Sequence, residues 1–444
     1  MKHAEQAQFE TSDIRIGQMS RASLAPVVAY ALLTQSPLTH ILDKIASVGD
    51  RVRVGPRMHF ILHPHDIDVI CRKHKKHIGL AHKQVKMMRG FSTKAYPSLV
   101  GIEGEKWRND RKILARHLMP EKGLQPVPLA TASKQINEML DSWFTTDSKV
   151  ISPADESSKL FVKLAYHALF NQPVPEETLE KLPEAMDNVE IYQFLLALSN
   201  GLLRKPISWF KRFREASNLT RKAALDVVKA NQESEEQSAL VNDYSSTGED
   251  IEFTATTIRM LMFASHTSMT YTLFNAIWNL AARPDLQNRI TAQNSNDPIL
   301  NQVIKETLRL NPAFTLLPKG VIADIELEDG YVLKKGDEIV ISPYITHKDE
   351  RFFESPDTFD PEVNFSTEAI LSRPEDSFIA YGPAKTQRTC PGRGAAEQQL
   401  SMILERMCCR FEFSRASNDI LVKRSINMMR PDTNSKIALR PRAA

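Results

Sequence analysis

Residues 378–394 read FIAYGPAKTQRTCPGRG, and this stretch decides the fold together with the helix that follows it. Cys390 lies in a loop rich in Gly, Pro and Thr. A cysteine just ahead of a helix meets unpaired N–H groups and the positive end of the helix dipole, which favour the thiolate. The thiolate can act as a nucleophile, a redox thiol or a metal ligand, and the loop alone leaves all three open. The helix is predicted from apolar residues with the spacing of one buried face: Leu400, Ile403, Leu404, Met407, Cys408 and Phe411.

The composition limits the class of protein and of partner. The 444 residues are 42% hydrophobic and 25% charged, which suits one large domain or about two to three ordinary ones. The net charge is only +3, and no Lys/Arg run resembles a nucleic-acid-binding arm. We therefore expect no nucleic-acid partner.

The cysteines and the apolar runs indicate where the protein works. Cys71, Cys390, Cys408 and Cys409 include no C-x-x-C pair, which argues against a cysteine zinc site. The adjacent Cys408 and Cys409 are typical of packing residues, and free cysteines fit a reducing cytosol. No stretch reaches the ~20 apolar residues of a membrane span. We expect a soluble, cytoplasmic protein without a membrane span.

The order of patterns predicts a mainly α fold with a small β-rich subdomain. Strand-like runs flank turn signals at Gly55-Pro56 and at Glu328-Asp329-Gly330. Elsewhere helical periodicity prevails. The predicted segments are a lead-in at 1–35, a single domain at 36–444, a β-rich corner at about 50–65 and 315–345, a helical bulk at 105–312 and the cysteine loop at 378–394.

The longest helical stretch runs from about Glu252 to Arg283 and stops before Pro284. It is apolar nearly all round, so we expect it to pass buried through the domain. Its middle, ASHTSMT at 264–270, is a cluster of hydroxyl groups. Hydroxyls inside a buried helix bond back to the carbonyl four residues earlier or serve a site.

Two residue pairs share helix faces by their spacing. Trp107 and Arg111 lie four apart in WRNDRK, and Glu306 and Arg309 lie three apart in KETLRLNP. Taken alone, the Glu306–Arg309 pair is typical of an ordinary surface ion pair.

Taken together and in this order, the motifs resemble the cytochrome P450 family of haem-thiolate enzymes, from about Leu38 to Phe413. The resemblance implies the cytochrome P450 fold, with haem b between the long central helix and the cysteine loop. The motifs are W-x-x-x-R (Trp107, Arg111), a degenerate A-G-x-[DE]-T (Ala264 to Ser268), E-x-x-R (Glu306, Arg309), FDPE (Phe359 to Glu362) and R-x-C-P-G (Arg388 to Gly392).

The resemblance also implies roles for individual residues. Cys390 would be the axial thiolate of the haem iron, and N–H groups from Gly392 onward would bond its sulfur. Glu306 and Arg309 would form a buried pair that holds the fold. The haem carboxylates need partners, for which the candidates are Arg111, Lys319 and Arg388 as cations and Trp107 as an N–H donor.

The central helix departs from the family pattern. Thr267 stands at the usual acid position and Ser268 at the usual threonine, next to Ala264 and His266. A hydroxyl for proton relay survives, whereas the neighbouring carboxylate does not. Proton delivery would then use water, His266 or another group, although packing is the more ordinary role for His266.

Two further departures lie near the cysteine. Val363 stands where the family has an arginine that joins the Glu306–Arg309 pair, which leaves Asn364 as the candidate substitute. Counting back from Cys390, the aromatic-glycine pair Tyr381-Gly382 is displaced, so the loop is about two residues longer than the pattern.

The resemblance implies a monooxygenase that inserts one oxygen atom from O2 into a small organic substrate. Electrons would come from separate partners of the ferredoxin and ferredoxin reductase type, and we expect a monomer. Alternatives are a haem-thiolate enzyme that uses peroxide or needs no redox partner, and a non-catalytic haem sensor. Candidates for an apolar substrate pocket are Met260, Ala264, Phe314 and Leu316, and those for a ferredoxin-docking face are Lys112, Arg116, Arg388 and Arg393.

Overall fold

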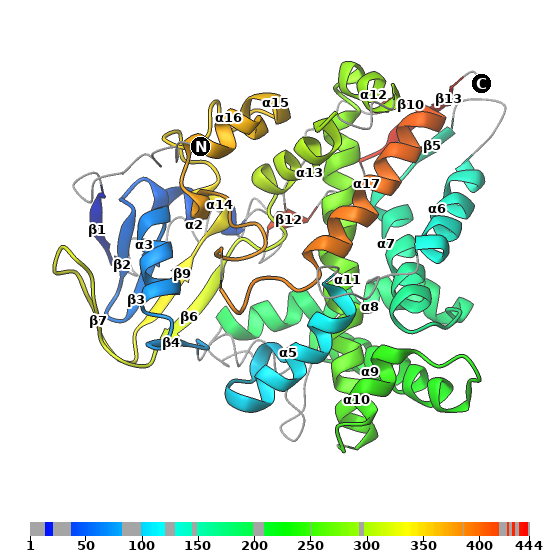
Figure 1. The fold of residues 1–444 in the computed structure, drawn as a ribbon, viewed down its shortest axis with the longest axis horizontal. Coiled ribbons are helices and arrows are strands. Elements are labelled where there is room, and N and C mark those ends of the chain that lie inside the picture. Colours follow the sequence, from blue (N-terminus) through cyan, green and yellow to red (C-terminus); the bar gives the residue numbers. More distant parts are fainter. Residues whose placement is uncertain are drawn as a thin grey trace, which may run out of the picture. The chain divides into compact units, whose positions relative to one another are not determined.

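The strand-like runs from both parts of the predicted β-rich corner join one sheet in the computed structural model (Figure 1). The fold is mostly helical with small sheets, as predicted. The structure describes residues 14–20, 37–81, 99–119, 129–143, 149–198, 208–248, 250–292, 297–384, 386–416, 424–425, 429–430 and 435–442.

The chain forms two compact units. The sheet unit comprises Met1–His82, Ala292–Cys390 and Asp419–Asp432. The helical unit comprises Lys83–Thr291, Pro391–Asn418 and Thr433–Ala444. The single domain expected over 36–444 stays a prediction. Among the described residues, no helix has both the length and the apolar character needed to cross a membrane.

The sheet unit is built on six strands. Strands β1 and β2 pair in parallel, as do β3 and β9, and the other neighbours are antiparallel. The predicted turn at Gly55 joins β2 to β3, and Gly55 has a φ of 69°, which glycine adopts without a Cβ penalty. The strand order is β1 (Ile16–Met19), β2 (Arg51–Val54), β3 (Met58–Ile61), β9 (Glu338–Ile341), β6 (Leu317–Val321) and β4 (Ile78–Gly79).

Strand β1 was not expected inside the lead-in at 1–35. Its four residues, IGQM, are too few to show a period, and contacts far along the chain hold it instead. The Arg15 N–H donates to Asp50 Oδ2 at 2.9 Å. A Cβ on Gly17 would lie 2.4 Å from Val48 Cγ1, so only glycine fits this approach.

Short helices and two hairpins complete the sheet unit. Helix α13 (Ile299–Leu310) begins just after Asp297-Pro298, and the Ile299 N–H donates to Asp297 Oδ1 at 3.0 Å. The predicted turn at 328–330 joins β7 (Ile325–Glu326) to β8 (Val332–Leu333). The remaining elements are α2 (Pro37–Ala46), α3 (Pro64–Asp68) with a π-helical turn (Val69–Lys73), α13 (Ile299–Leu310), α14 (Pro343–Thr346), α15 (Pro361–Phe365), α16 (Thr367–Ser372), a 3-10 turn (Glu375–Ser377), β11 (Arg424–Ser425) and β12 (Met429–Arg430).

The helical unit is organised around α11 (Ile251–Leu280), the long buried helix predicted from its all-round apolar pattern. Its N-cap is Asp250, whose carboxylate accepts the Phe253 N–H at 3.0 Å. The other elements are α5 (Gly104–Leu118), α6 (Leu129–Trp143), α7 (Pro153–Leu164), α8 (Glu176–Leu198), α9 (Ser208–Glu233), α10 (Ala239–Ser245), α12 (Pro284–Thr291), α17 (Arg393–Arg410), the 3-10 turn Leu99–Gly101, the π-helical turn Ala165–Leu169 and an antiparallel sheet of β10 (Phe411–Arg415), β13 (Ile437–Pro441) and β5 (Lys149–Ile151).

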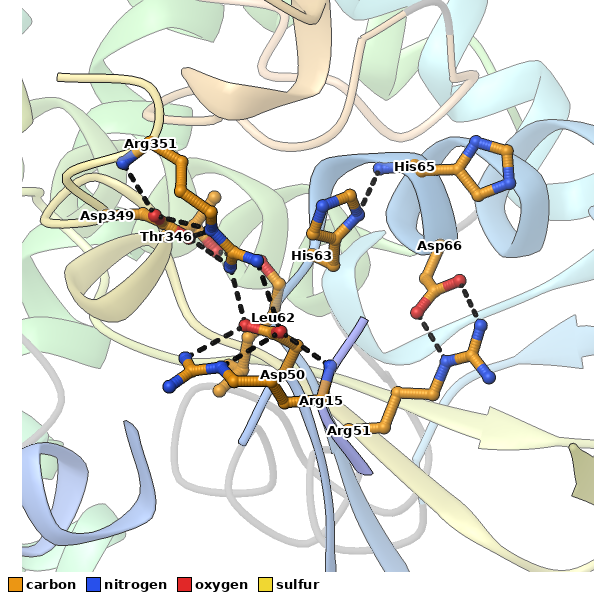
Figure 2. Close-up of polar contacts among 10 residues, drawn as sticks. All are labelled: Arg15, Asp50, Arg51, Leu62, His63, His65, Asp66, Thr346, Asp349 and Arg351. Atoms are coloured by element: carbon orange, nitrogen blue, oxygen red, sulfur yellow. Dashed lines mark hydrogen bonds and ion pairs between the residues drawn. The ribbon is translucent and has the colours of Figure 1, made fainter. Parts of the chain in front are cut away.

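Two neighbouring charge clusters anchor the sheet unit (Figure 2). In one, Asp50 accepts from Arg15 and from Arg351, whose Nη2 lies 2.6 Å from Asp50 Oδ1. In the other, Arg51 donates twice to Asp66 at 2.6 and 2.7 Å, with side-chain exposures of only 1% and 2%. Burial alone would raise the pKa of Asp50, but the hydrogen bonds from Arg351 and Arg15 outweigh it and lower the pKa.

We predict that Arg51→Ala lowers the free energy of unfolding by about 3–5 kcal/mol, because Asp66 is left buried without its partner. The control Arg53→Ala removes an exposed arginine two residues along the same strand and should cost less than about 1 kcal/mol. Urea unfolding followed by far-UV circular dichroism measures both. Equal losses in the two variants would contradict the prediction.

Candidate functional site

The cysteine loop ends just ahead of a helix, as the sequence predicts. Helix α17 begins at Arg393 with Gly392 at its N-cap, three residues after Cys390. The Cys390 N–H donates to the Tyr381 carbonyl at 2.9 Å. Gly382 turns the chain with a φ of 93°, and its N–H donates to the Ile379 carbonyl at 2.9 Å. The loop therefore closes on itself through backbone atoms.

Exposure singles out Cys390 among the four cysteines. Cys390 is exposed, whereas Cys71 and Cys408 are buried and Cys409 is half-buried. Burial raises the pKa of Cys71 to about 11 and that of Cys408 to about 12, so both remain thiols. Cys408 is a packing residue, as expected. An accessible sulfur on a backbone-held loop suits a metal ligand.

Several residues in the middle of α11 are not buried, whereas most of the helix is. Ala264 is exposed, and Ser265 and Ser268 are half-buried. The Ser268 hydroxyl donates to the Ala264 carbonyl at 2.8 Å, and that of Ser265 donates to the Leu261 carbonyl at 2.8 Å. Positions 264 and 268 are four apart and so share one helix face. This face therefore combines a small side chain with a hydroxyl group.

His266 and Thr267 lie inside the helical unit. His266 is buried, and its Nε2 lies 2.7 Å from Ser158 Oγ on α7. Its Nδ1 lies 3.4 Å from Thr267 Oγ1, and Thr267 is also fully buried. These contacts fit the packing role for His266. Of the four residues expected near the reacting oxygen, Ala264 and Ser268 are the two that are not buried.

The expected partners of the haem carboxylates are divided between the two units. In the helical unit, α5 carries Trp107, which is buried, and Arg111, which is half-buried. In the sheet unit, Lys319 is half-buried on β6 and Arg388 is exposed in the cysteine loop. Each of these side chains is of a type that binds carboxylates, either as a cation or as an N–H donor.

The Glu306–Arg309 pair is fully buried, as the resemblance implies and unlike an ordinary surface pair. Arg309 donates twice to Glu306 at 2.7 and 2.8 Å, and both side chains are 0% exposed. Glu306 Oε1 also accepts from Asn364 Nδ2 at 3.1 Å and from the Asp360 N–H at 3.0 Å. Asn364 therefore fills the place left by the missing arginine, as predicted.

Arg373 was not found by sequence analysis. Its Nη1 donates to the Asn364 carbonyl at 2.6 Å, and its guanidinium lies 4.5 Å from the Phe353 ring centroid and 4.7 Å from that of Phe365. Burial lowers the pKa of Arg373 to about 10, while the charge of Glu306 acts to raise it. It adds positive charge near Glu306 where Val363 cannot.

His347 is the second residue that sequence analysis missed. Burial, with the charge of Arg309 next, lowers the pKa of His347 to about 3, so the ring is neutral at physiological pH. Its Nε2 accepts the Ile379 N–H at 2.9 Å, which leaves the proton on Nδ1 to donate to the Arg309 carbonyl at 3.2 Å. The ring joins α13 to the start of the cysteine loop.

For the substrate-pocket and docking candidates, the structure gives burial and ion pairs but no shared site. Met260 is buried, while Phe314 and Leu316 are half-buried. The resemblance also implies pocket residues in the stretches 80–100 and 190–210, of which 82–98 and 199–207 lie outside the described residues. Two of the four basic docking candidates are in ion pairs: Arg116 with Asp243 at 2.7 Å and Arg393 with Glu397 at 3.1 Å.

Comparisons with known proteins identify the family. Residues 50–437 match the family model of Cytochrome P450. Cytochrome P450 6a9 of Drosophila melanogaster is 29% identical over 192 residues, 38% of this chain and 38% of the relative. Human Cytochrome P450 4V2 is 32% identical over 160 residues, 32% of this chain and 30% of the relative. The matched part thus spans less than two fifths of the length of these relatives.

A solved structure shows the same fold. Retinoic acid-bound cyanobacterial CYP120A1 superposes with a TM-score of 0.75 over 90% of this chain and 93% of that chain. The two sequences are 17% identical.

We predict that Asn364→Asp lowers the free energy of unfolding by about 3 kcal/mol or more at pH 7.5, because a second carboxylate then lies beside buried Glu306. Burial and like charge raise the pKa of the new acid above its unfolded value. The loss should therefore be full above that pKa and shrink as the pH falls through it.

The matched variant Asn364→Ala removes the same hydrogen bond to Glu306 without adding charge. Its loss should be nearly the same at pH 7.5 and pH 5.5, measured by urea unfolding at both. A loss in Asn364→Asp that does not change with pH would refute the electrostatic explanation.

Proposed function

The chain belongs to the cytochrome P450 family, and from that premise we propose that it is a haem-thiolate monooxygenase. Haem b is the cofactor of this family. The observation that carries the proposal is the exposed Cys390, held by backbone hydrogen bonds three residues ahead of α17. The overall reaction would convert R–H, O2, two electrons and two protons into R–OH and water.

The residues present fit the group. Cys390 is the accessible thiol, and Arg111, Lys319, Arg388 and Trp107 are the candidate carboxylate partners. With a thiolate bound to it, haem iron supplies reductive cleavage of the O–O bond. Lysine at position 319 keeps the charge of the family's arginine but loses the bidentate fork.

Ser268 is proposed to hold and pass the protons that this chemistry consumes. Its hydroxyl hydrogen is donated to the Ala264 carbonyl at 2.8 Å, so its oxygen can accept a hydrogen bond from water. To relay a proton, the hydroxyl would turn away from the Ala264 carbonyl and release its own hydrogen as it takes up one from the water. Ala264 keeps the same helix face clear of side-chain bulk. Thr267 is buried in place of the family's acid, and His266 is buried against Ser158, so water is the proton source proposed here.

We propose a small, apolar organic substrate and separate electron donors. Met260, Phe314 and Leu316 support the apolar pocket, because each is apolar and buried or half-buried. A ferredoxin and its reductase would supply the electrons. The enzyme would act as a cytoplasmic monomer.

A second candidate function is peroxide-driven oxidation. It is favoured by the absence of a carboxylate at position 267, since peroxide brings its own protons and electrons. Product formation with a ferredoxin system and NAD(P)H supports the monooxygenase. Product formation with hydrogen peroxide alone selects the alternative.

We predict that Cys390→Ser abolishes the thiolate-type Soret band of the reduced carbon monoxide complex. A serine hydroxyl stays protonated at neutral pH and is a poor iron ligand. Cys409→Ser is the matched control, because Cys409 is half-buried on α17, and it should keep the band. An unchanged band in Cys390→Ser would refute the axial role.

We predict that Ser268→Ala roughly doubles or more the peroxide released per NAD(P)H consumed, since general acid–base groups contribute large rate factors, on the order of a hundredfold or more. Ser265→Ala is the matched control. It removes a hydroxyl of the same helix that likewise donates to carbonyls of the preceding turn but has no proposed relay role. Peroxide and product are measured together. Unchanged coupling in Ser268→Ala would argue against a relay.

A further inference from the structure

One peptide bond in the cysteine loop is held at both ends. The Pro383 carbonyl accepts from Thr386 Oγ1 at 3.1 Å and from Thr389 Oγ1 at 3.0 Å. Thr389 Oγ1 also lies 3.0 Å from the Thr386 carbonyl, so its single hydrogen has two acceptors to choose between. The N–H on the other side of the same peptide, that of Ala384, donates to Asp376 Oδ1 at 2.6 Å. Thr389 directly precedes Cys390. We call these four side-chain and backbone groups the loop clamp: Asp376, the Pro383–Ala384 peptide, Thr386 and Thr389.

The clamp lies where the loop departs from the family pattern. Tyr381-Gly382 is the displaced aromatic-glycine pair, and Arg388 is the arginine two before the cysteine. The clamped peptide falls between them, in the part that is about two residues longer. Extra residues add conformational freedom to the loop. Additional contacts must restrict that freedom if the Cys390 sulfur is to keep a single orientation.

Asp376 is an unusual residue for a purely structural contact. It lies on the 3-10 turn Glu375–Ser377 and is 4% exposed. Burial raises its pKa to about 6; the Ala384 N–H lowers it, Asp68 and Glu375 raise it, and Arg72 lowers it. Because the folded pKa lies above the usual value, ionising this group at neutral pH weakens the fold. A neutral acceptor would hold the amide at less cost.

The negative charge can nevertheless serve the site through the peptide. An amide N–H that donates to a carboxylate makes a short, charge-assisted bond. Hydrogen bonds in a chain polarise one another, so the carbonyl of the same peptide becomes a better acceptor. The Pro383 carbonyl then holds the Thr389 hydroxyl more firmly, next to the cysteine.

We propose that Asp376 is a positioning residue for Cys390, acting through the Pro383–Ala384 peptide and Thr389 to fix the direction of the sulfur. The inference rests on the proposed axial role of Cys390. It assigns to the buried turn at 375–377 the task of compensating for the lengthened loop.

The test uses the haem-loaded full-length protein and follows the loss of the thiolate-type Soret band in the reduced carbon monoxide complex over time. Asp376→Ala should lose the band about tenfold faster or more, since a charge-assisted hydrogen bond is worth a factor of that order. Its far-UV thermal midpoint should not fall, because a buried carboxylate with a raised pKa is removed. Asp376→Asn keeps an acceptor for the Ala384 N–H but loses the charge, so its band lifetime should lie between that of Asp376→Ala and that of the wild type.

Two further variants separate positioning from general stability. Glu375→Gln, the matched control, removes an exposed carboxylate one residue away and should behave as the wild type. Thr389→Val cuts the clamp at its other end and should shorten the band lifetime as Asp376→Ala does. The double variant should be little worse than either single one, because both break the same chain of hydrogen bonds.

Each outcome decides the inference. A wild-type band lifetime in Asp376→Ala overturns it, and so does a faster loss that only accompanies a lower thermal midpoint. Additive effects of Asp376→Ala and Thr389→Val also overturn it. If Cys390→Ser keeps the band, the axial role itself fails. If Cys390→Ser loses the band while Asp376→Ala keeps it, the clamp alone is refuted.

Discussion

The buried Glu306–Arg309 pair is the constraint on which the sheet unit depends around the cysteine loop. Two opposite charges at 0% exposure lose their hydration, so their remaining hydrogen-bonding capacity must be met by the chain. Arg309 donates to the carbonyls of His347, Pro356 and Thr358, and Glu306 accepts from the Asp360 N–H and from Asn364. The irregular segment between α14 and α15 is thereby fixed, although it has little regular secondary structure.

The neutral imidazole ring of His347 connects this network to the cysteine loop. The His347 backbone carbonyl accepts from Arg309 Nη1. The His347 ring donates from Nδ1 to the Arg309 carbonyl and accepts the Ile379 N–H at Nε2. Its low pKa matters here, because a protonated ring could not accept that N–H and would add a second positive charge beside Arg309. These residues thus form one connected hydrogen-bond network of the sheet unit, from α13 to residue 379.

The sequence was sufficient for the parts of this site that follow a local spacing. Cys390 before a helix, the Glu306–Arg309 pair, the long α11 and the Asn364 substitution all follow from residue types at fixed offsets. His347, Arg373 and Asp376 have no such pattern, since a lone histidine, arginine or aspartate is ordinary until burial and a distant backbone partner are known. Strand β1 was missed for the same reason: contacts to residues 48 and 50 hold it, and its own four residues do not.

The cysteine loop shows how a cysteine ahead of a helix can be held while the sequence around it departs from the family pattern. Backbone groups hold the loop. The Ile379 N–H donates to His347, the Ala384 N–H donates to Asp376, and the Cys390 N–H donates to the Tyr381 carbonyl. Backbone groups are present whatever side chain a position carries, so substitutions in the loop leave the anchors in place. Only the side-chain acceptors, His347 and Asp376, must remain able to accept a hydrogen bond, and both lie outside the loop at 378–394. A loop held in this way can lengthen by two residues, provided that the added residues gain an anchor, and the Ala384 N–H on Asp376 lies in that added part.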